Sequence, residues 1–129
     1  MGKITAIVID DDRDTVGVFS DYLKLKNVEV LGKGYNGKEA VELFSKLKPD
    51  VVFLDQRMPE YDGLFALHHI RQKDSNANVI IITAENTLDE NPKVQELKPT
   101  KIIHKPFNIS EVMDTVEEIM KEKIIIIIK

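Results

Sequence analysis

The sequence predicts an α/β fold in which a parallel sheet is covered by helices on both faces. Short apolar runs alternate with helical patterns five times along the 129 residues. The runs have no polar break, which is typical of strands buried on both faces, and their alternation with helices favours parallel pairing. The clearest run, Val-Val-Phe-Leu at 51–54, ends in the carboxylate of Asp55.

Composition excludes several classes of function. With 18 basic and 22 acidic residues the net charge is −4, which favours neither nucleic acid nor a membrane surface as a partner. The absence of cysteine excludes disulfides, thiolate metal sites and a cysteine nucleophile. The amino terminus lacks the apolar stretch of a signal peptide, and the longest apolar run, 124–128, is too short to cross a bilayer. We therefore expect a cytoplasmic protein.

The first half of the chain divides clearly into elements. Asp12 is placed to cap a helix, and Val16, Phe19 and Leu23 recur at the spacing of one buried helical face. Pro49 ends a later helix and introduces the run at 51–54. The expected elements are a strand at 4–9, a helix at 12–26, a strand at 28–31, a glycine loop at 32–37, a helix ending at 47 and the strand at 51–54.

The second half continues the alternation. Its segment 85–99 is polar with Pro92 near the middle, so any helix there is short, around 93–97. Asn108 and Glu111 form a capping box for the last helix. The expected elements are a loop at 56–62, a helix to 72, strands at 79–82 and 101–104, and a last helix that buries Ile109, Val112, Met113, Val116, Ile119 and Met120.

Polar side chains follow four of the predicted strands. The carboxyl ends of parallel strands meet at one edge and form a crevice, so these side chains are expected to lie together. Converging carboxylates repel one another unless a cation neutralises them, and oxygen ligands favour Mg²⁺. A hydroxyl and a lysine beside such a metal indicate phosphoryl chemistry, although any one strand-end aspartate could simply cap a helix. The residues are Asp10, Asp11, Asp55, Thr83 and Lys105.

The motifs at these strand ends resemble the response-regulator receiver domain of two-component signalling, of the stand-alone, chemotaxis-regulator-like kind. The resemblance runs from residue 4 to about residue 120 and implies a three-layer, flavodoxin-like (βα)5 doubly wound sheet with strand order 2-1-3-4-5. The motifs are Asp10-Asp11, the run Leu-Asp-Gln-Arg-Met-Pro at 54–59 with Asp62-Gly63, Thr83-Ala84, and Lys105-Pro106-Phe107.

The resemblance also implies roles for individual residues. Asp55 would accept a phosphoryl group from a sensor histidine kinase, in a reaction that depends on Mg²⁺. The protein would then signal by contact with a downstream protein that the sequence does not identify. It would be no enzyme beyond catalysing its own phosphoryl transfer and autodephosphorylation. The implied metal ligands are Asp10 (through water), Asp11, Asp55 and the backbone carbonyl of Arg57, and the implied phosphoryl-binding residues are Thr83, Ala84 and Lys105.

Three residues near the site depart from the family pattern or add to it. Ile102 stands where receiver domains commonly carry an aromatic residue that rotates on phosphorylation, so the output route is expected to differ. Arg57 and Glu85 each lie two residues beyond a site residue and could pair across its mouth, as a gate that slows dephosphorylation. Two solvated side chains are the alternative.

The carboxyl terminus is unusual. We expect a receiver domain at 1–123 and an isoleucine-rich tail at 124–129, with no output domain. Five consecutive β-branched residues at 124–128 form a segment that a monomer rarely exposes. The tail could continue the last helix, add an edge strand or be a foreign extension, and we expect homo-oligomerisation through it.

Two other functions fit part of the sequence. Gly32, Gly34 and Gly37 form a literal G-x-G-x-x-G, typical of a small nucleotide-binding regulatory module, but that function leaves Thr83 and Lys105 unused. A haloacid-dehalogenase-type phosphatase needs an Asp-x-Asp nucleophile, which Asp10 and Asp12 supply. It also needs a late acidic pair at a strand end, where this chain has none, and it leaves the Asp55 segment unexplained.

Overall fold

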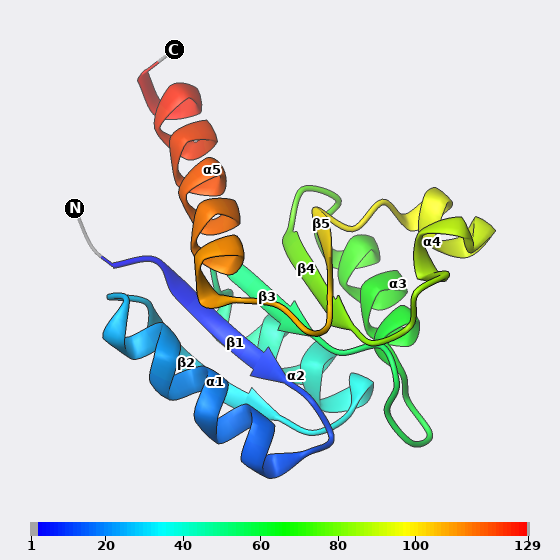
Figure 1. The fold of residues 1–129 in the computed structure, drawn as a ribbon. Coiled ribbons are helices and arrows are strands. Elements are labelled where there is room, and N and C mark those ends of the chain that lie inside the picture. The colour runs from blue at the N-terminus through cyan, green and yellow to red at the C-terminus, as the bar shows by residue number, and fades with distance from the viewer. Residues whose placement is uncertain (1–2, 129) are drawn as a thin grey trace.

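A single sheet of five parallel strands lies at the centre of the protein (Figure 1). The computed structural model describes residues 3–128, with side chains from 3 to 122. The sheet order is β2-β1-β3-β4-β5, so the predicted fold class and strand order are confirmed. The strands are β1 (Thr5–Ile9), β2 (Glu29–Gly34), β3 (Val51–Leu54), β4 (Asn78–Thr83) and β5 (Lys101–His104).

Helices cover both faces of the sheet (Figure 1). The buried side chains of α1 and α5 pack on one face, and those of α2, α3 and α4 pack on the other. Because alternate strand residues point to opposite faces, the unbroken apolar run of β3 supplies both layers. The helices are α1 (Arg13–Leu25), α2 (Gly37–Leu47), α3 (Gly63–Lys73), the 3₁₀ turn η1 (Leu88–Glu90), α4 (Pro92–Leu97) and α5 (Ile109–Ile128).

Side-chain caps set the starts of three helices that follow strands. Asp12 accepts from the backbone N–H groups of Asp14 and Thr15 at the start of α1, as predicted. Asn36 and Asp62 cap α2 and α3 in the same way. Capping satisfies N–H groups that have no partner within the helix, so each cap fixes where its helix begins after the strand that precedes it. Loops and helix starts therefore gather at the carboxyl edge of the sheet.

The prediction of a glycine loop at 32–37 is wrong for its first half, because β2 continues through Gly34. A Cβ atom on Gly32 would lie 2.9 Å from Leu47 Cδ1, and one on Gly34 would lie 3.1 Å from Leu43 Cδ1. The glycines thus allow α2 to pack closely on β2. A glycine-rich segment resembles a loop in sequence, but here the missing side chains leave room for a helix.

The burial predicted for the last helix is correct at three positions and too deep at the others. Val112, Val116 and Ile119 are buried against the sheet. Three further apolar side chains lie at the edge of that core and are only partly buried, because a straight helix turns part of its apolar stripe away from the twisted sheet. They are Ile109, Met113 and Met120.

The backbone of the isoleucine-rich tail continues α5 as far as Ile128, so the tail extends the last helix and does not add an edge strand. The side chains of 123–129 lie outside the described residues, and self-association through 124–128 therefore stays a prediction. Within the described chain, no helix combines the length and apolar character needed to span a bilayer.

Substitution of two glycines by alanine should change stability in opposite directions. At Gly34 a methyl group meets Ile9 Cδ1 at 2.8 Å and Leu43 Cδ1 at 3.1 Å, so Gly34→Ala should lower the free energy of unfolding by about 1–3 kcal/mol. At Gly17, inside α1, nothing lies within 4 Å, and alanine should raise it by about 0.5–1 kcal/mol through helix propensity. Urea denaturation measures both values. Equal effects would contradict the packing described for α2 on β2.

Candidate functional site

Three carboxylates converge where β1 and β3 end. Asp10 and Asp11 follow β1 and Asp55 follows β3, and each offers one oxygen within 4.8 Å of the others. The two strands are neighbours, and the backbone N–H of Asp55 donates to the Ile9 carbonyl at 3.0 Å. Asp10 is buried, Asp55 is half-buried and Asp11 is exposed. The solvent exposure of the three carboxylates thus increases from Asp10 through Asp55 to Asp11.

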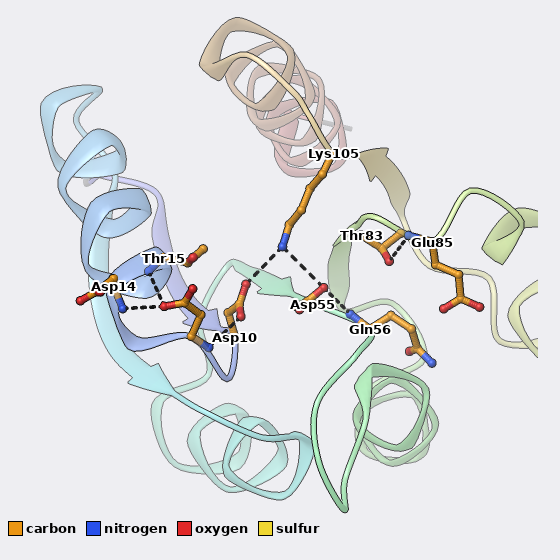
Figure 2. Close-up of polar contacts among 9 residues, drawn as sticks. Asp10, Asp14, Thr15, Asp55, Gln56, Thr83, Glu85 and Lys105 are labelled. Carbon is orange, nitrogen blue, oxygen red and sulfur yellow. Dashed lines mark hydrogen bonds and ion pairs between the residues drawn. The ribbon is translucent and has the colours of Figure 1, made fainter.

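Lys105 follows the edge strand β5, and its side chain extends toward this cluster. Figure 2 shows its ammonium group between Asp10 and Asp55, with Nζ 3.4 Å from Asp10 Oδ2 and 3.8 Å from Asp55 Oδ1. The residue follows β5, and its backbone N–H donates to the Thr83 carbonyl at 2.8 Å. One ammonium group faces three carboxylates, so the site keeps an excess of negative charge.

Burial and mutual repulsion alter the acidity of the two inner carboxyls. Burial, followed by the charge of Asp10, raises the pKa of Asp55 from 3.8 to about 6, although Lys105 acts in the opposite direction. Burial also raises the pKa of Asp10. A hard cation would relieve this repulsion, and an all-oxygen ligand set of three carboxylates fits Mg²⁺.

Asp12 serves a different purpose from its two neighbours. Backbone N–H groups, that of Thr15 first, hold the pKa of Asp12 below its usual range. Its own N–H donates to Asp10 Oδ1 at 3.0 Å. Asp12 is therefore a helix cap that also orients Asp10, which leaves the Asp-x-Asp of the phosphatase alternative without a second site carboxylate.

Thr83 lies at the end of β4, beside the acidic cluster and fully buried. Its hydroxyl oxygen accepts from the backbone N–H of Glu85 at 3.0 Å, as Figure 2 shows. Ala84, between them, is exposed. The structure thus brings the predicted threonine to the crevice, but its hydroxyl is engaged within its own turn.

Arg57 and Glu85, each two residues beyond a predicted site residue, form an ion pair. Arg57 Nε lies 3.9 Å from Glu85 Oε2, and the side chains are 79% and 28% exposed. This is a long ion pair between an exposed arginine and a half-buried glutamate, and its role as a gate stays a prediction. Ile102 lies on β5 and packs at the edge of the core formed with α2, α3 and α4.

Two site neighbours were missed by the sequence analysis. Gln56, directly after Asp55, is buried with its side-chain amide bonded on both ends. His104 Nε2 lies 2.8 Å from Asp89 Oδ1 and so links the end of β5 to η1. Neither belongs to a periodic pattern, and an amide within a polar loop gives no sequence signal of burial.

Comparison with known proteins identifies the family to which this chain belongs. A family model described as the response regulator receiver domain matches residues 6–117. The chain belongs to this family. It is 32% identical over 121 residues to the chemotaxis protein CheY of Thermotoga maritima, covering 94% of this chain and 100% of that protein. It is also 32% identical over 117 residues to sporulation initiation phosphotransferase F of Bacillus subtilis, covering 91% and 94% of the two chains.

A solved complex provides a structural comparison. The crystal structure of a CheX–CheY–BeF3–Mg²⁺ complex from Borrelia burgdorferi matches with a TM-score of 0.83 and 25% identity, over 91% of this chain and 89% of that chain. The protein is thus a receiver domain homologous to phosphoacceptor response regulators of two-component systems. Close packing accounts for the G-x-G-x-x-G at 32–37. Its glycines serve the packing of α2, and Gly37 N–H donates to the Tyr61 carbonyl at 2.7 Å.

The raised pKa of Asp55 predicts how stability depends on pH without metal. Because the folded pKa exceeds the unfolded one, its contribution to stability is fully present below about pH 4 and is lost as pH rises through about 6. With EDTA at pH 7.5, the free energy of unfolding of Asp55→Asn should therefore exceed that of wild type by about 1–2 kcal/mol. The gain should vanish below pH 4. Urea denaturation across this range measures it, with Asp21→Asn on the exposed side of α1 as the control. If Asp55→Asn raised the free energy of unfolding by the same amount at every pH, the raised pKa of Asp55 would be contradicted.

Proposed function

We propose that Asp55 accepts a phosphoryl group from a phosphohistidine of a partner histidine kinase. An oxygen of its carboxylate forms a bond to phosphorus as the P–N bond breaks. The electron pair stays on the imidazole nitrogen, which takes up a proton, and the product is an aspartyl phosphate. The observation that carries this proposal is the convergence of Asp10, Asp11 and Asp55 with Lys105 at one edge of the sheet.

The ligand set supports a role for Mg²⁺. Asp11 and Asp55 would hold it directly, Asp10 through water, and the backbone carbonyl of Arg57 would complete the protein ligands. When bound, Mg²⁺ supplies positive charge to the incoming phosphoryl oxygens. The complex of the Borrelia CheY with BeF3 and Mg²⁺ supports this assignment by homology.

The remaining site residues act on the phosphoryl group itself. Lys105, already within 3.8 Å of Asp55, would pair with a phosphoryl oxygen. The Thr83 hydroxyl would leave the N–H of Glu85 and donate to another oxygen beside Ala84. Because that bond exists only with the phosphoryl group present, it biases the protein toward a second conformation.

The signal would pass onward by protein contact. Ile102 cannot make the ring rotation that an aromatic residue makes at this position, so the movement of Thr83 would reach the surface by another route. The receiver acts as a signalling phosphoacceptor, and the only reactions we propose for it are its own phosphorylation and dephosphorylation.

Labelling with a small phosphodonor tests this function. Wild type should incorporate phosphate only when Mg²⁺ is present, and Asp55→Asn should incorporate none because the nucleophile is gone. Asp21→Asn, which removes an exposed carboxylate from α1, should label like wild type. Phosphate retained by Asp55→Asn would overturn the proposal.

The Arg57–Glu85 pair should slow hydrolysis of the aspartyl phosphate by obstructing the attacking water. A double alanine variant, which keeps the Arg57 carbonyl, should lose phosphate about 2–5-fold faster, because an exposed ion pair is worth at most about 1 kcal/mol. Decay of label after removal of donor gives the rate. Glu90→Ala, which removes an exposed carboxylate from η1, should leave this rate unchanged. No acceleration in the double variant would reject the gate and leave two solvated side chains.

A further inference from the structure

We infer that Gln56 is a positioning residue that holds the Asp55 carboxylate and the loop carrying the Arg57 carbonyl in the geometry for Mg²⁺. The inference rests on the function proposed above. Gln56 is 8% exposed although it lies in a loop between a strand and a helix. Its backbone and side chain together make four hydrogen bonds, all to residues between Asp55 and Leu64.

The first bond fixes the carboxylate. The backbone N–H of Gln56 donates to Asp55 Oδ1 at 2.9 Å, as Figure 2 shows. The ammonium group of Lys105 approaches the same oxygen at 3.8 Å. The backbone N–H and the ammonium group therefore act on the same oxygen of Asp55, which restrains rotation of the carboxylate.

The other three bonds close the loop that follows. The side-chain carbonyl of Gln56 accepts from Leu64 N–H at 2.8 Å, and its amide donates to Asp62 Oδ2 at 3.2 Å. Its backbone carbonyl accepts from Gly63 N–H at 2.9 Å. The N–H groups at the start of α3 have no partner within the helix. Gln56 supplies hydrogen-bond acceptors for two of them, those of Gly63 and Leu64. Gln56 therefore links the end of β3 to the start of α3.

The fit around Gln56 is tight and specific for an amide. A Cβ atom on Gly63 would lie 2.6 Å from the Asp55 carbonyl and 2.8 Å from Gln56 Oε1, so α3 begins directly against the end of β3. A carboxylate in place of the amide would have no proton for Asp62. An apolar side chain would leave the Leu64 N–H and an Asp62 oxygen without a partner.

Arg57 follows Gln56 directly, so the bonds of Gln56 also place the carbonyl proposed as a metal ligand. The far side of the same loop is held separately, where Gly37 N–H donates to the Tyr61 carbonyl at 2.7 Å. The loop is thus anchored at its start by Gln56 and near its end by α2. Partners that orient metal ligands affect metal affinity without touching the ion.

Calorimetric titration with Mg²⁺ alone, on the full chain, tests this role. Gln56→Met keeps the volume but removes the side-chain bonds, and should weaken Mg²⁺ binding about tenfold or more. Gln56→Asn, one methylene shorter, keeps a polar group in the pocket in case the methionine variant does not fold, and should weaken binding in the same way. Gln72→Met, at an exposed position of α3, should bind like wild type.

Labelling separates positioning from loss of the fold. In the folded Gln56 variants the half-saturating Mg²⁺ concentration should rise with the dissociation constant, while labelling of Asp55 at saturating Mg²⁺ should stay close to wild type. Wild-type Mg²⁺ affinity in a folded Gln56 variant, or a loss no larger than that of Gln72→Met, would overturn the inference. Because the titration needs no phosphodonor, this outcome is distinct from label persisting in Asp55→Asn, which would overturn the proposed function.

Discussion

Repulsion among the carboxylates of Asp10, Asp11 and Asp55 is the constraint on which the rest of the site depends. The fold requires it, because β1 and β3 are neighbours and their ends place three acids within 4.8 Å. Burial of Asp10 and Asp55 withholds the solvent that would screen their charges, and the pKa of Asp55 rises to about 6. The site is therefore least stable in the charged form that phosphoryl transfer needs, and a cation or the single ammonium group of Lys105 must offset that cost.

The rest of the fold serves to hold these charges in place. Lys105 is fixed by its backbone bond to Thr83, so the group that opposes the carboxylates is tied to the proposed switch residue. Asp12 caps α1 and also donates to Asp10, while Gln56 supports both Asp55 and the start of α3. Single residues thus bond both to a helix start and to a site carboxylate at this edge. Movement of one of these helices would therefore displace a carboxylate of the site.

The sequence predicted what depends on local pattern. Apolar runs located β1 and β3, and the acids that follow them are at the sheet edge because parallel strands end together. It failed where a residue's role comes from a distant segment. Gly34 suggested a loop because its contact with Leu43 of α2 is not visible in sequence, and Gln56 gave no sign that α3 would return onto it.

We propose that Asp55 carries the phosphoryl group, and chemical trapping tests this most directly. Reduction of an aspartyl phosphate with borohydride converts that residue to homoserine, which peptide mass spectrometry can locate. After Mg²⁺-dependent phosphorylation of wild type, we expect homoserine at position 55 and unmodified aspartate at positions 10 and 11. Homoserine at position 10, or phosphate that is not released by reduction, would contradict the account.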